Sequence, residues 1–243
     1  MKTILPKKYR NLLYLSIFLI LINLLVIYFY DLQVSRYVRL ASTTIVLVYS
    51  LFYKGYKFKF LFVALLAFLI KDIFVLDYED PFSKTMSFVF GNFAYILVVL
   101  LVLLKVKFKK STPIILVFVL TLVILNVVNV FYLSDIIVQK LDNTTQYVLF
   151  MLQSVLLILL GLVGFSYNER YVGKTPLLFL YLVMSIIMCD LAGLAAYFFE
   201  FQVAFYFERI FYLLSLILLL NFSINRETQI SNNLVLKEKE FIL

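Results

Sequence analysis

Two aspartates lie inside apolar segments of membrane-spanning length. Asp72 comes directly after Lys71 near the end of residues 58–76, and Asp190 lies within residues 175–199. A carboxylate at that depth costs at least a few kcal/mol, so each aspartate is a candidate functional residue. Asp72 has a second interpretation, because it lies only about a turn and a half before Asp77 of an acidic loop and would stay hydrated there.

Buried aspartates could carry out acid–base chemistry without a metal or a histidine. Two carboxylates in unequal surroundings separate a proton donor from a group that stabilises positive charge. The chain has no histidine and a single cysteine, Cys189. These counts exclude Cys/His metal sites and nucleophilic systems that depend on histidine. We therefore expect no metal site and no cofactor, so any chemistry must come from carboxylates, Lys, Arg, Tyr or hydroxyl groups.

The segments that position these residues are strongly apolar. Apolar residues make up 64% of the 243 residues, and the mean hydropathy is +1.03. Apolar runs of around 20 residues are long enough to cross a bilayer as helices. We predict an all-α fold, a polytopic bundle of transmembrane helices within the lipid bilayer. The net charge of +8 does not indicate nucleic-acid binding, because the basic residues lie in short loops between the spans.

Apolar length and helix-start signals predict eight spans. A proline in the first turn after Asp or Thr marks three of the starts, at Pro81, Pro113 and Pro176. We divide the chain into an eight-helix transmembrane domain, residues 1–222, and a short cytoplasmic tail, residues 223–243. The predicted spans are residues 11–30, 37–53, 58–76, 81–104, 111–133, 145–165, 175–199 and 203–222.

The loops between these spans alternate in charge. Lysine and arginine collect at the N-terminus and after the second, fourth, sixth and eighth spans. The other loops are acidic or nearly uncharged, and the loop with Asp77, Glu79 and Asp80 is the most acidic. Cytoplasmic loops carry the excess of basic residues in membrane proteins. We therefore expect both termini in the cytoplasm, and a multi-pass protein of the cell membrane.

The strongly polar side chains of seven predicted spans fall in the outer half of the membrane. Charged groups in spans usually face the bundle interior or a wet cavity and pair there, so we infer a polar cavity toward the outer leaflet. For Arg39 and Lys71, the alternative is that their long stems reach the outer headgroups. Sequence neighbours point about 100° apart on a helix, so the buried carboxylates should pair with an arginine of another helix, Arg39 or Arg209. The polar residues are Arg39, Lys71, Asp72, Asn92, Asn126, Asn129, Gln146, Gln153, Asp190, Glu208 and Arg209.

This layout resembles the YhhN-like family of membrane proteins, the lysoplasmalogenases. The shared features are eight spans, an aspartate near the end of the third, an aspartate within the seventh and an aromatic–glycine pattern on the fourth. The family shows Gly-Asp and Ser-Asp where this chain has Lys71-Asp72 and Cys189-Asp190. The family pattern of Phe, Gly, Phe, His and Tyr on the fourth span reads here Phe88, Gly91, Tyr95, Val99 and Val102.

The resemblance implies hydrolysis of the vinyl-ether bond of lysoplasmalogens, which releases a fatty aldehyde. Vinyl ethers are protonated slowly at carbon, and water captures the resulting oxocarbenium ion. A carboxylic acid can donate the proton and a second, ionised carboxylate can stabilise the cation, as in glycosidases. The implied catalytic residues are Asp72 and Asp190, and the implied partner is a lysophospholipid-like membrane lipid. The implied substrate-binding residues, whose cations would hold the phosphate, are Arg39, Lys71, Asn92, Tyr95, Glu208 and Arg209.

Two other functions fit the same residues. The first is a lipid-binding or lipid-sensing membrane protein that has the cavity and no catalysis, because the histidine of the family pattern is missing. The second is a small proton-coupled transporter, since intramembrane acids and a weak repeat of Lys71-Asp72 in Cys189-Asp190 also suit proton coupling. A membrane anchor for signalling is disfavoured, because residues 223–243 hold no output domain.

Overall fold

The computed structural model describes the backbone of residues 7–52, 59–103, 117, 120–121, 123–124, 127, 137–171 and 173–240. Within these ranges it describes side chains from residue 10 to residue 225. The fifth predicted span, residues 111–133, with Asn126 and Asn129, therefore lies almost wholly outside the described residues. The other seven predicted spans lie within them apart from residues 53, 58 and 104.

The described residues form seven α-helices and one short 3-10 helix, which confirms the all-α prediction. Five of the α-helices are long and apolar enough to cross a membrane: residues 10–29 of α1, then α4, α6 and α7, and residues 202–225 of α8. The α-helices are α1 (Lys7–Phe29), α2 (Leu32–Phe52), α3 (Lys59–Val75), α4 (Pro81–Leu103), α6 (Thr144–Arg170), α7 (Lys174–Tyr197) and α8 (Gln202–Glu240), and the 3-10 helix is η3 (Val138–Lys140). The protein is thus a multi-pass helical membrane protein, while the count of eight spans remains a prediction.

The other two described helices, α2 and α3, are not among these candidate spans for two different reasons. α3 has only 17 residues, three short of the roughly 20 that cross the hydrocarbon core without tilt or thinning. α2 is long enough, but its buried stripe is polar and lowers its mean hydropathy. The stripe includes Ser35, Arg36, Arg39, Ser42, Thr43 and Ser50.

α2 also shows on which side the apolar residues of this protein lie. Tyr37, Ile45 and Val48 are exposed on the face opposite its polar stripe. A water-soluble protein buries the apolar face of a helix, whereas a lipid-embedded bundle exposes it and turns charged groups inward. α1 exposes the same kind of surface through Leu13 and Phe18. This inverted pattern supports the membrane setting independently of helix length.

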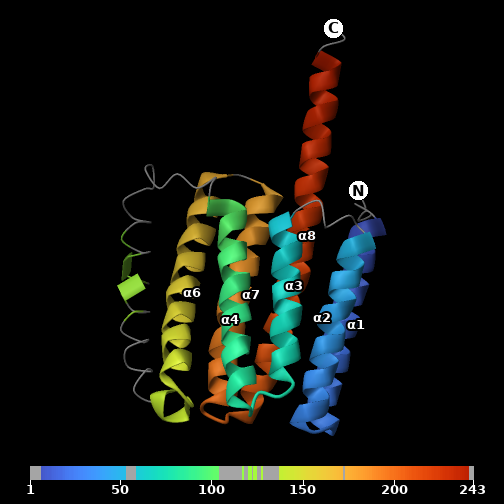
Figure 1. The fold of residues 1–243 in the computed structure, drawn as a ribbon. Helices are drawn as coiled ribbons and strands as arrows, with labels where there is room; N and C mark the ends of the chain where they lie inside the picture. The colour runs from blue at the N-terminus through green and yellow to red at the C-terminus, as the bar shows by residue number, and fades with distance from the viewer. Residues whose placement is uncertain are drawn as a thin grey trace.

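The seven helices form a closed circuit (Figure 1). Each of the pairs α1–α2, α2–α3, α3–α4, α4–α6, α6–α7, α7–α8 and α8–α1 is in contact. α8 also touches α2 and α3, so it packs against four other helices and occupies the middle of the bundle. Because α8 is central, its side chains reach both α2 and α3 on one side and α7 on the other.

α8 continues well beyond the predicted end of the eighth span at residue 222. The helix runs unbroken to Glu240, and residues 202–225 of it form the candidate membrane span. Figure 1 shows this C-terminal part of α8 projecting past the ends of the other helices. The predicted tail of residues 223–243 is therefore helical through Glu240.

Ion pairs connect the loops at the opposite end of the bundle. The guanidinium of Arg36 on α2 donates two hydrogen bonds of 2.7 Å to the carboxylate of Glu79, between α3 and α4. The Lys84 ammonium lies 3.0 Å from the Asp142 carboxylate before α6, and the Lys140 ammonium lies 2.7 Å from that of Glu200. The hydrogen bonds from Arg36 to Glu79, from Lys84 to Asp142 and from Lys140 to Glu200 lower the pKa of each carboxyl. The contact from Arg36 to Glu79 ties the loop between α3 and α4 to α2.

Candidate functional site

Four charged side chains from three helices meet inside the bundle. The Arg39 guanidinium of α2 donates from Nε to Asp72 Oδ1 of α3 at 2.8 Å and from Nη1 to Glu208 Oε1 of α8 at 2.6 Å. Arg209, next to Glu208 on α8, places its Nε 3.6 Å from Glu208 Oε2. We call these four residues the charge cluster. Its two cations balance its two anions, and all four side chains are at most 4% exposed.

Neutral side chains complete the hydrogen bonding of Asp72. Its Oδ2 accepts from the hydroxyl of Thr43 at 2.5 Å and from that of Tyr212 at 2.6 Å. The guanidinium carbon of Arg39 lies 3.9 Å from the centre of the Tyr212 ring, which adds a cation–π contact. Both Asp72 oxygens thus accept hydrogen bonds, the geometry of an ionised carboxylate. A buried ion pair needs this degree of satisfaction to offset its desolvation.

The α8 side of the charge cluster is less complete. Glu208 Oε2 has no hydrogen-bond partner among the described residues, and the same holds for Arg209 Nε and Nη1. The 3.6 Å separation of Arg209 Nε from Glu208 Oε2 exceeds hydrogen-bond length. The third nitrogen of Arg209, Nη2, donates to the hydroxyl of Ser35 at 3.1 Å. Unpaired buried polar atoms are costly and rare in proteins, so this part of the cluster calls for an explanation.

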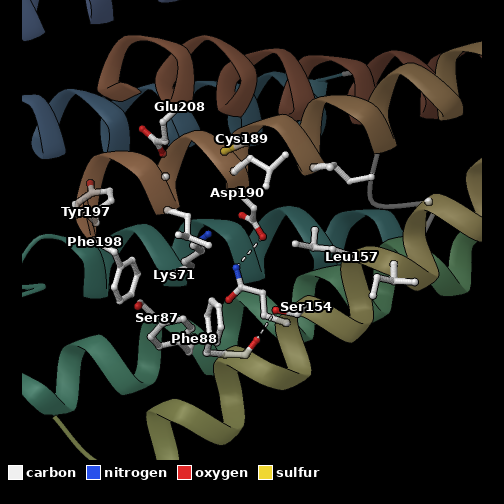
Figure 2. A pocket seen from close by; sticks show the side chains of 18 of the residues that line it. Lys71, Ser87, Phe88, Ser154, Leu157, Cys189, Asp190, Tyr197, Phe198 and Glu208 are labelled. Carbon is white, nitrogen blue, oxygen red and sulfur yellow. Dashed lines mark hydrogen bonds between the residues drawn. The ribbon is translucent and has the colours of Figure 1, made fainter. Parts of the chain in front are cut away.

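A cavity of about 530 Å³ lies beside the charge cluster, between α3, α4, α6, α7 and α8. This volume is within the range of sites that bind small molecules. Figure 2 shows Glu208, Tyr197 and Lys71 at one part of the cavity, with Leu157 farther along it. The polar and aromatic lining residues include Arg39, Lys71, Tyr78, Ser87, Gln153, Ser154, Asp190, Tyr197 and Glu208, and the apolar ones include Phe88, Leu157, Ile158, Leu162, Phe165 and Ile187.

Asp190 of α7 is the carboxylate that neutral groups position at the cavity wall. The hydroxyl of Tyr95 on α4 donates to its Oδ1 at 2.6 Å, and the side-chain amide of Gln153 on α6 donates to its Oδ2 at 2.7 Å. The bond from Gln153 is visible in Figure 2. Because both donors are uncharged, no side chain in this arrangement cancels the charge of the Asp190 carboxylate.

Lys71 supplies a cation to the same cavity. Its ammonium lies 5.9 Å from the centre of the Tyr95 ring, and its stem passes over Gly91 of α4. A Cβ at Gly91 would lie 3.5 Å from Lys71 Cδ, so the glycine lets the lysine stem lie close to α4. Within the described residues, no carboxylate forms an ion pair with Lys71. The cavity therefore holds opposite charges that are not paired with each other.

Aromatic residues from the loops close one side of the cavity. Tyr78, in the loop between α3 and α4, packs against Tyr197 with ring centres 5.2 Å apart, and both line the cavity. Burial raises the pKa of Tyr78 far above its ordinary value, so this phenol stays neutral. Glu79, held by Arg36, comes directly after Tyr78. The ion pair at the loop thus fixes the position of a cavity wall.

The structure separates the two aspartates that the sequence placed in one site. Asp72 belongs to the charge cluster and is not part of the cavity lining, whereas Asp190 is. The prediction that a buried carboxylate pairs with Arg39 or Arg209 of another helix is confirmed for Asp72, which pairs with Arg39. The expectation that adjacent Glu208 and Arg209 would not approach each other is wrong in part, since both side chains bend to within 3.6 Å.

Two further predicted substrate-binding residues lie in the packed interior. Asn92 of α4 donates to the backbone carbonyl of Leu149 at 3.0 Å and is not part of the cavity lining, so its contact joins α4 to α6. Tyr95 is 2% exposed and reaches the cavity only through its bond to Asp190. Arg209 is fully buried behind Glu208. Of the six predicted substrate-binding residues, the cavity lining contains Arg39, Lys71 and Glu208.

Sequence reasoning did not assign a role to Thr43, Tyr212 or Gln153. A helical-spacing signal was present for two of them: Thr43 is four residues after Arg39, and Tyr212 is four after Glu208. Residues four apart share a helix face, so each lies beside a buried charge. Gln153 was recognised as a polar residue of its span, but nothing in the sequence links it to Asp190, because that contact joins two different helices.

The described residues contain no group of three or more His, Cys, Asp or Glu side chains that could hold a metal ion. This chain matches no family model, no curated protein and no solved structure. These comparisons therefore do not show that the chain belongs to the YhhN-like family, and the residue roles that the resemblance implies are proposals. What the structure itself establishes is a multi-pass bundle of membrane helices with a charge cluster and an adjoining cavity.

Proposed function

We propose that this membrane protein binds a single-chain, lysophospholipid-like lipid in the cavity. The observation that carries the proposal is the division of the cavity lining into a polar part and an apolar part. Lys71, Asp190 and Glu208 lie at one part, and the rest is lined mainly by Phe, Leu and Ile side chains. An amphiphile with a polar head and one hydrocarbon chain matches this division. Its head would contact the polar side chains, and its chain would contact the apolar ones.

Lipid fits the surroundings of the cavity better than a water-soluble ligand of the same size. The helices that enclose it expose apolar side chains outward, for example Phe93 of α4 and Leu152 of α6. A ligand that is already dissolved in the bilayer therefore reaches these helices directly. The cavity volume of about 530 Å³ accommodates a head and part of one acyl-like chain more readily than a two-chain phospholipid.

Hydrolysis of a vinyl ether is the second candidate, and the position of Asp190 favours it. In that reaction a proton adds to the terminal carbon of the C=C–O group, water adds to the resulting oxocarbenium carbon, and the hemiacetal breaks into an aldehyde and an alcohol. Asp190 would donate the proton when it is protonated, with Tyr95 and Gln153 holding its orientation. Asp72 would act from the charge cluster, through Arg39 and Glu208, without touching the lipid.

Both candidates are tested with purified protein and a lysoplasmalogen in detergent, by following lipid binding and aldehyde release together. Lipid binding with aldehyde release that disappears in Asp190→Asn would support the hydrolase. Binding without release from the wild type would leave the lipid-binding function alone. Glu200→Gln is the matched control, because Glu200 is an exposed carboxylate in the loop between α7 and α8. Absence of binding by any single-chain lipid would overturn the proposal.

A further inference from the structure

Arg39 belongs at the same time to the charge cluster and to the cavity wall. Its Nε is bonded to Asp72 and its Nη1 to Glu208, and its side chain contributes to the cavity lining. Glu208 also lines the cavity. An anionic group that enters the cavity near Glu208 would therefore meet a guanidinium that already donates to two carboxylates of the protein itself.

Glu208 has a second cation within reach. Its Oε2 has no hydrogen-bond partner among the described residues and lies 3.6 Å from Arg209 Nε. Arg209 is fully buried and keeps two nitrogens, Nε and Nη1, without hydrogen-bond partners in the described part of the chain. A small rotation of the Glu208 carboxylate toward Arg209 would form a charge-assisted hydrogen bond in place of the one to Arg39. In the first arrangement the Glu208 carboxylate is bonded to Arg39, and in the second it is bonded to Arg209.

We infer that Arg39 is the anion-binding group of this cavity, which Glu208 covers in the empty state and uncovers by turning to Arg209. The ligand class is a single-chain amphiphile with an anionic head, such as a phosphate monoester, so the inference rests on the proposed lipid-binding function. Lys71 contributes a second positive charge from the same cavity. The head would be held by Arg39 Nη1 and Lys71 Nζ, while Arg39 Nε stays bonded to Asp72.

The positions of two cationic groups, Arg39 and Lys71, support an anionic head at this part of the cavity. With Glu208 turned to Arg209, the pairs Arg39–Asp72 and Arg209–Glu208 are each neutral, and the cavity keeps one cation, Lys71, and one anion, Asp190, which form no ion pair with each other among the described residues. One added negative charge satisfies Lys71 and the freed nitrogen of Arg39 together. Arginine is suited to this task, because its planar guanidinium can donate two parallel hydrogen bonds to one phosphate or carboxylate group. Asp190, held by Tyr95 and Gln153, keeps the anionic head away from its own part of the wall.

The exchange predicts that Glu208 competes with the ligand. A ligand that binds only the uncovered state has its affinity reduced by the fraction of protein in which Arg39 is covered. Replacing Glu208 by glutamine removes the competing charge and should tighten the binding of an anionic amphiphile, whereas the loss of an ordinary ligand-binding residue would weaken it. Removing Arg209 takes away the alternative partner of Glu208 and should have the opposite effect.

The experiment measures the binding of two probes with the same chain, dodecyl phosphate and the uncharged 1-dodecanoylglycerol, to the full chain in detergent. For the wild type we expect dodecyl phosphate to bind about tenfold tighter than the neutral probe. For Glu208→Gln we expect this ratio to rise severalfold, and for Arg209→Met we expect it to fall severalfold, with binding of the neutral probe changed less than twofold in both. Glu200→Gln and Arg170→Met, which alter exposed charges at the two ends of the bundle, are the matched controls.

The outcomes separate the inference from the function on which it rests. If neither probe binds the wild type, the lipid-binding proposal is wrong and the exchange falls with it. If the neutral probe binds and Glu208→Gln leaves the phosphate preference unchanged or lowers it, only the exchange is wrong. A variant that does not fold is replaced by Glu208→Asp. The shorter side chain of Glu208→Asp reaches Arg39 less well than glutamate does. This variant should therefore also raise the preference for dodecyl phosphate.

Discussion

The bundle has a packed side and a hollow side, and each places an aspartate in a different setting. On the packed side, where α2, α3 and α8 meet, Asp72 accepts hydrogen bonds from a guanidinium and two hydroxyls and is 1% exposed. On the hollow side, between α4, α6 and α7, Asp190 accepts bonds from two neutral groups and faces the cavity. The first environment satisfies the carboxylate with partners from the protein itself. The second leaves a charge available to a ligand.

This difference suggests that Asp72 serves the structure more than the chemistry. Removing one partner of a buried ion pair leaves the other charge buried and uncompensated, which is strongly destabilising. A carboxylate that faces a cavity with neutral partners costs much less to remove, because the loss is of ordinary hydrogen bonds. The two aspartates should therefore give opposite results when stability and ligand binding are measured side by side.

The largest effect is expected for Asp72→Asn. The change removes one of the two carboxylates that share Arg39 and leaves the charge cluster with an excess positive charge in the bundle interior. We expect a loss of about 3–5 kcal/mol in the free energy of unfolding. Thermal or denaturant unfolding of the purified protein in detergent checks this value. A loss below about 1 kcal/mol would show that water or another anion replaces Asp72.

Asp190→Asn should change function and leave stability nearly intact. Asparagine has the shape of aspartate and can still accept from Tyr95, so we expect a loss of no more than about 1 kcal/mol in the free energy of unfolding. Aldehyde release from a lysoplasmalogen should fall by a factor of about 10² or more, the usual contribution of a general acid. If both aspartate variants lose stability equally, the distinction between a packed side and a hollow side is wrong.

Two glycines of α6 sharpen the comparison at the level of packing. A Cβ at Gly164 would lie 3.1 Å from a methyl carbon of Val183 on α7, whereas a Cβ at Gly161, in the cavity wall, meets Ile187 at 3.7 Å. We expect Gly164→Ala to cost about 1–2 kcal/mol through overpacking. Gly161→Ala should be neutral or stabilise the protein by a few tenths to about 1 kcal/mol, since alanine is the better helix former. Unfolding of the two variants under the same conditions checks the order.

The smallest effect concerns the loop that carries Tyr78 over the cavity. The bonds from Arg36 lower the pKa of Glu79 below its unfolded value of about 4.3, so the folded state favours the ionised carboxylate. The resulting stability is complete above about pH 4.3 and is lost as the pH falls through the lower folded-state pKa. We expect Glu79→Gln to reduce stability at pH 7 by less than about 1 kcal/mol, because Glu79 is largely exposed, and to have no effect at the acid limit. Unfolding from pH 7 to pH 3, for wild type and variant, provides the measurement.

The sequence was sufficient for those features that depend on one helix at a time. Apolar length located the seven described α-helices, with ends that differ by a few residues apart from the N-terminal part of α2, the C-terminal part of α6 and the long extension of α8. Intramembrane charge alone identified Arg39, Asp72, Asp190 and Glu208 as candidate site residues. The partner of Asp72 could be narrowed to two arginines, because a buried carboxylate needs a cation and few are available at that depth.

The features that depend on two or more helices could not be predicted. Residues of α2, α3 and α8 form the charge cluster, and their assembly depends on how these helices rotate about their axes. For the same reason the sequence could not show that Asp72 and Asp190 have different surroundings: each helix position was known, but the direction of each side chain was not. Gln153 and Tyr78 likewise enter the site through contacts with partners that lie far away in the sequence.

The length of α8 has a mechanical consequence for the charge cluster. Glu208, Arg209 and Tyr212 all lie on this helix, which continues about 15 residues beyond Asn225 to Glu240, a distance of roughly 22 Å. An unbroken helix transmits rotation and tilt along its axis as a rod does. If α8 rotates when Glu208 changes its arginine partner, the projecting end of the helix would therefore rotate with it (Figure 1).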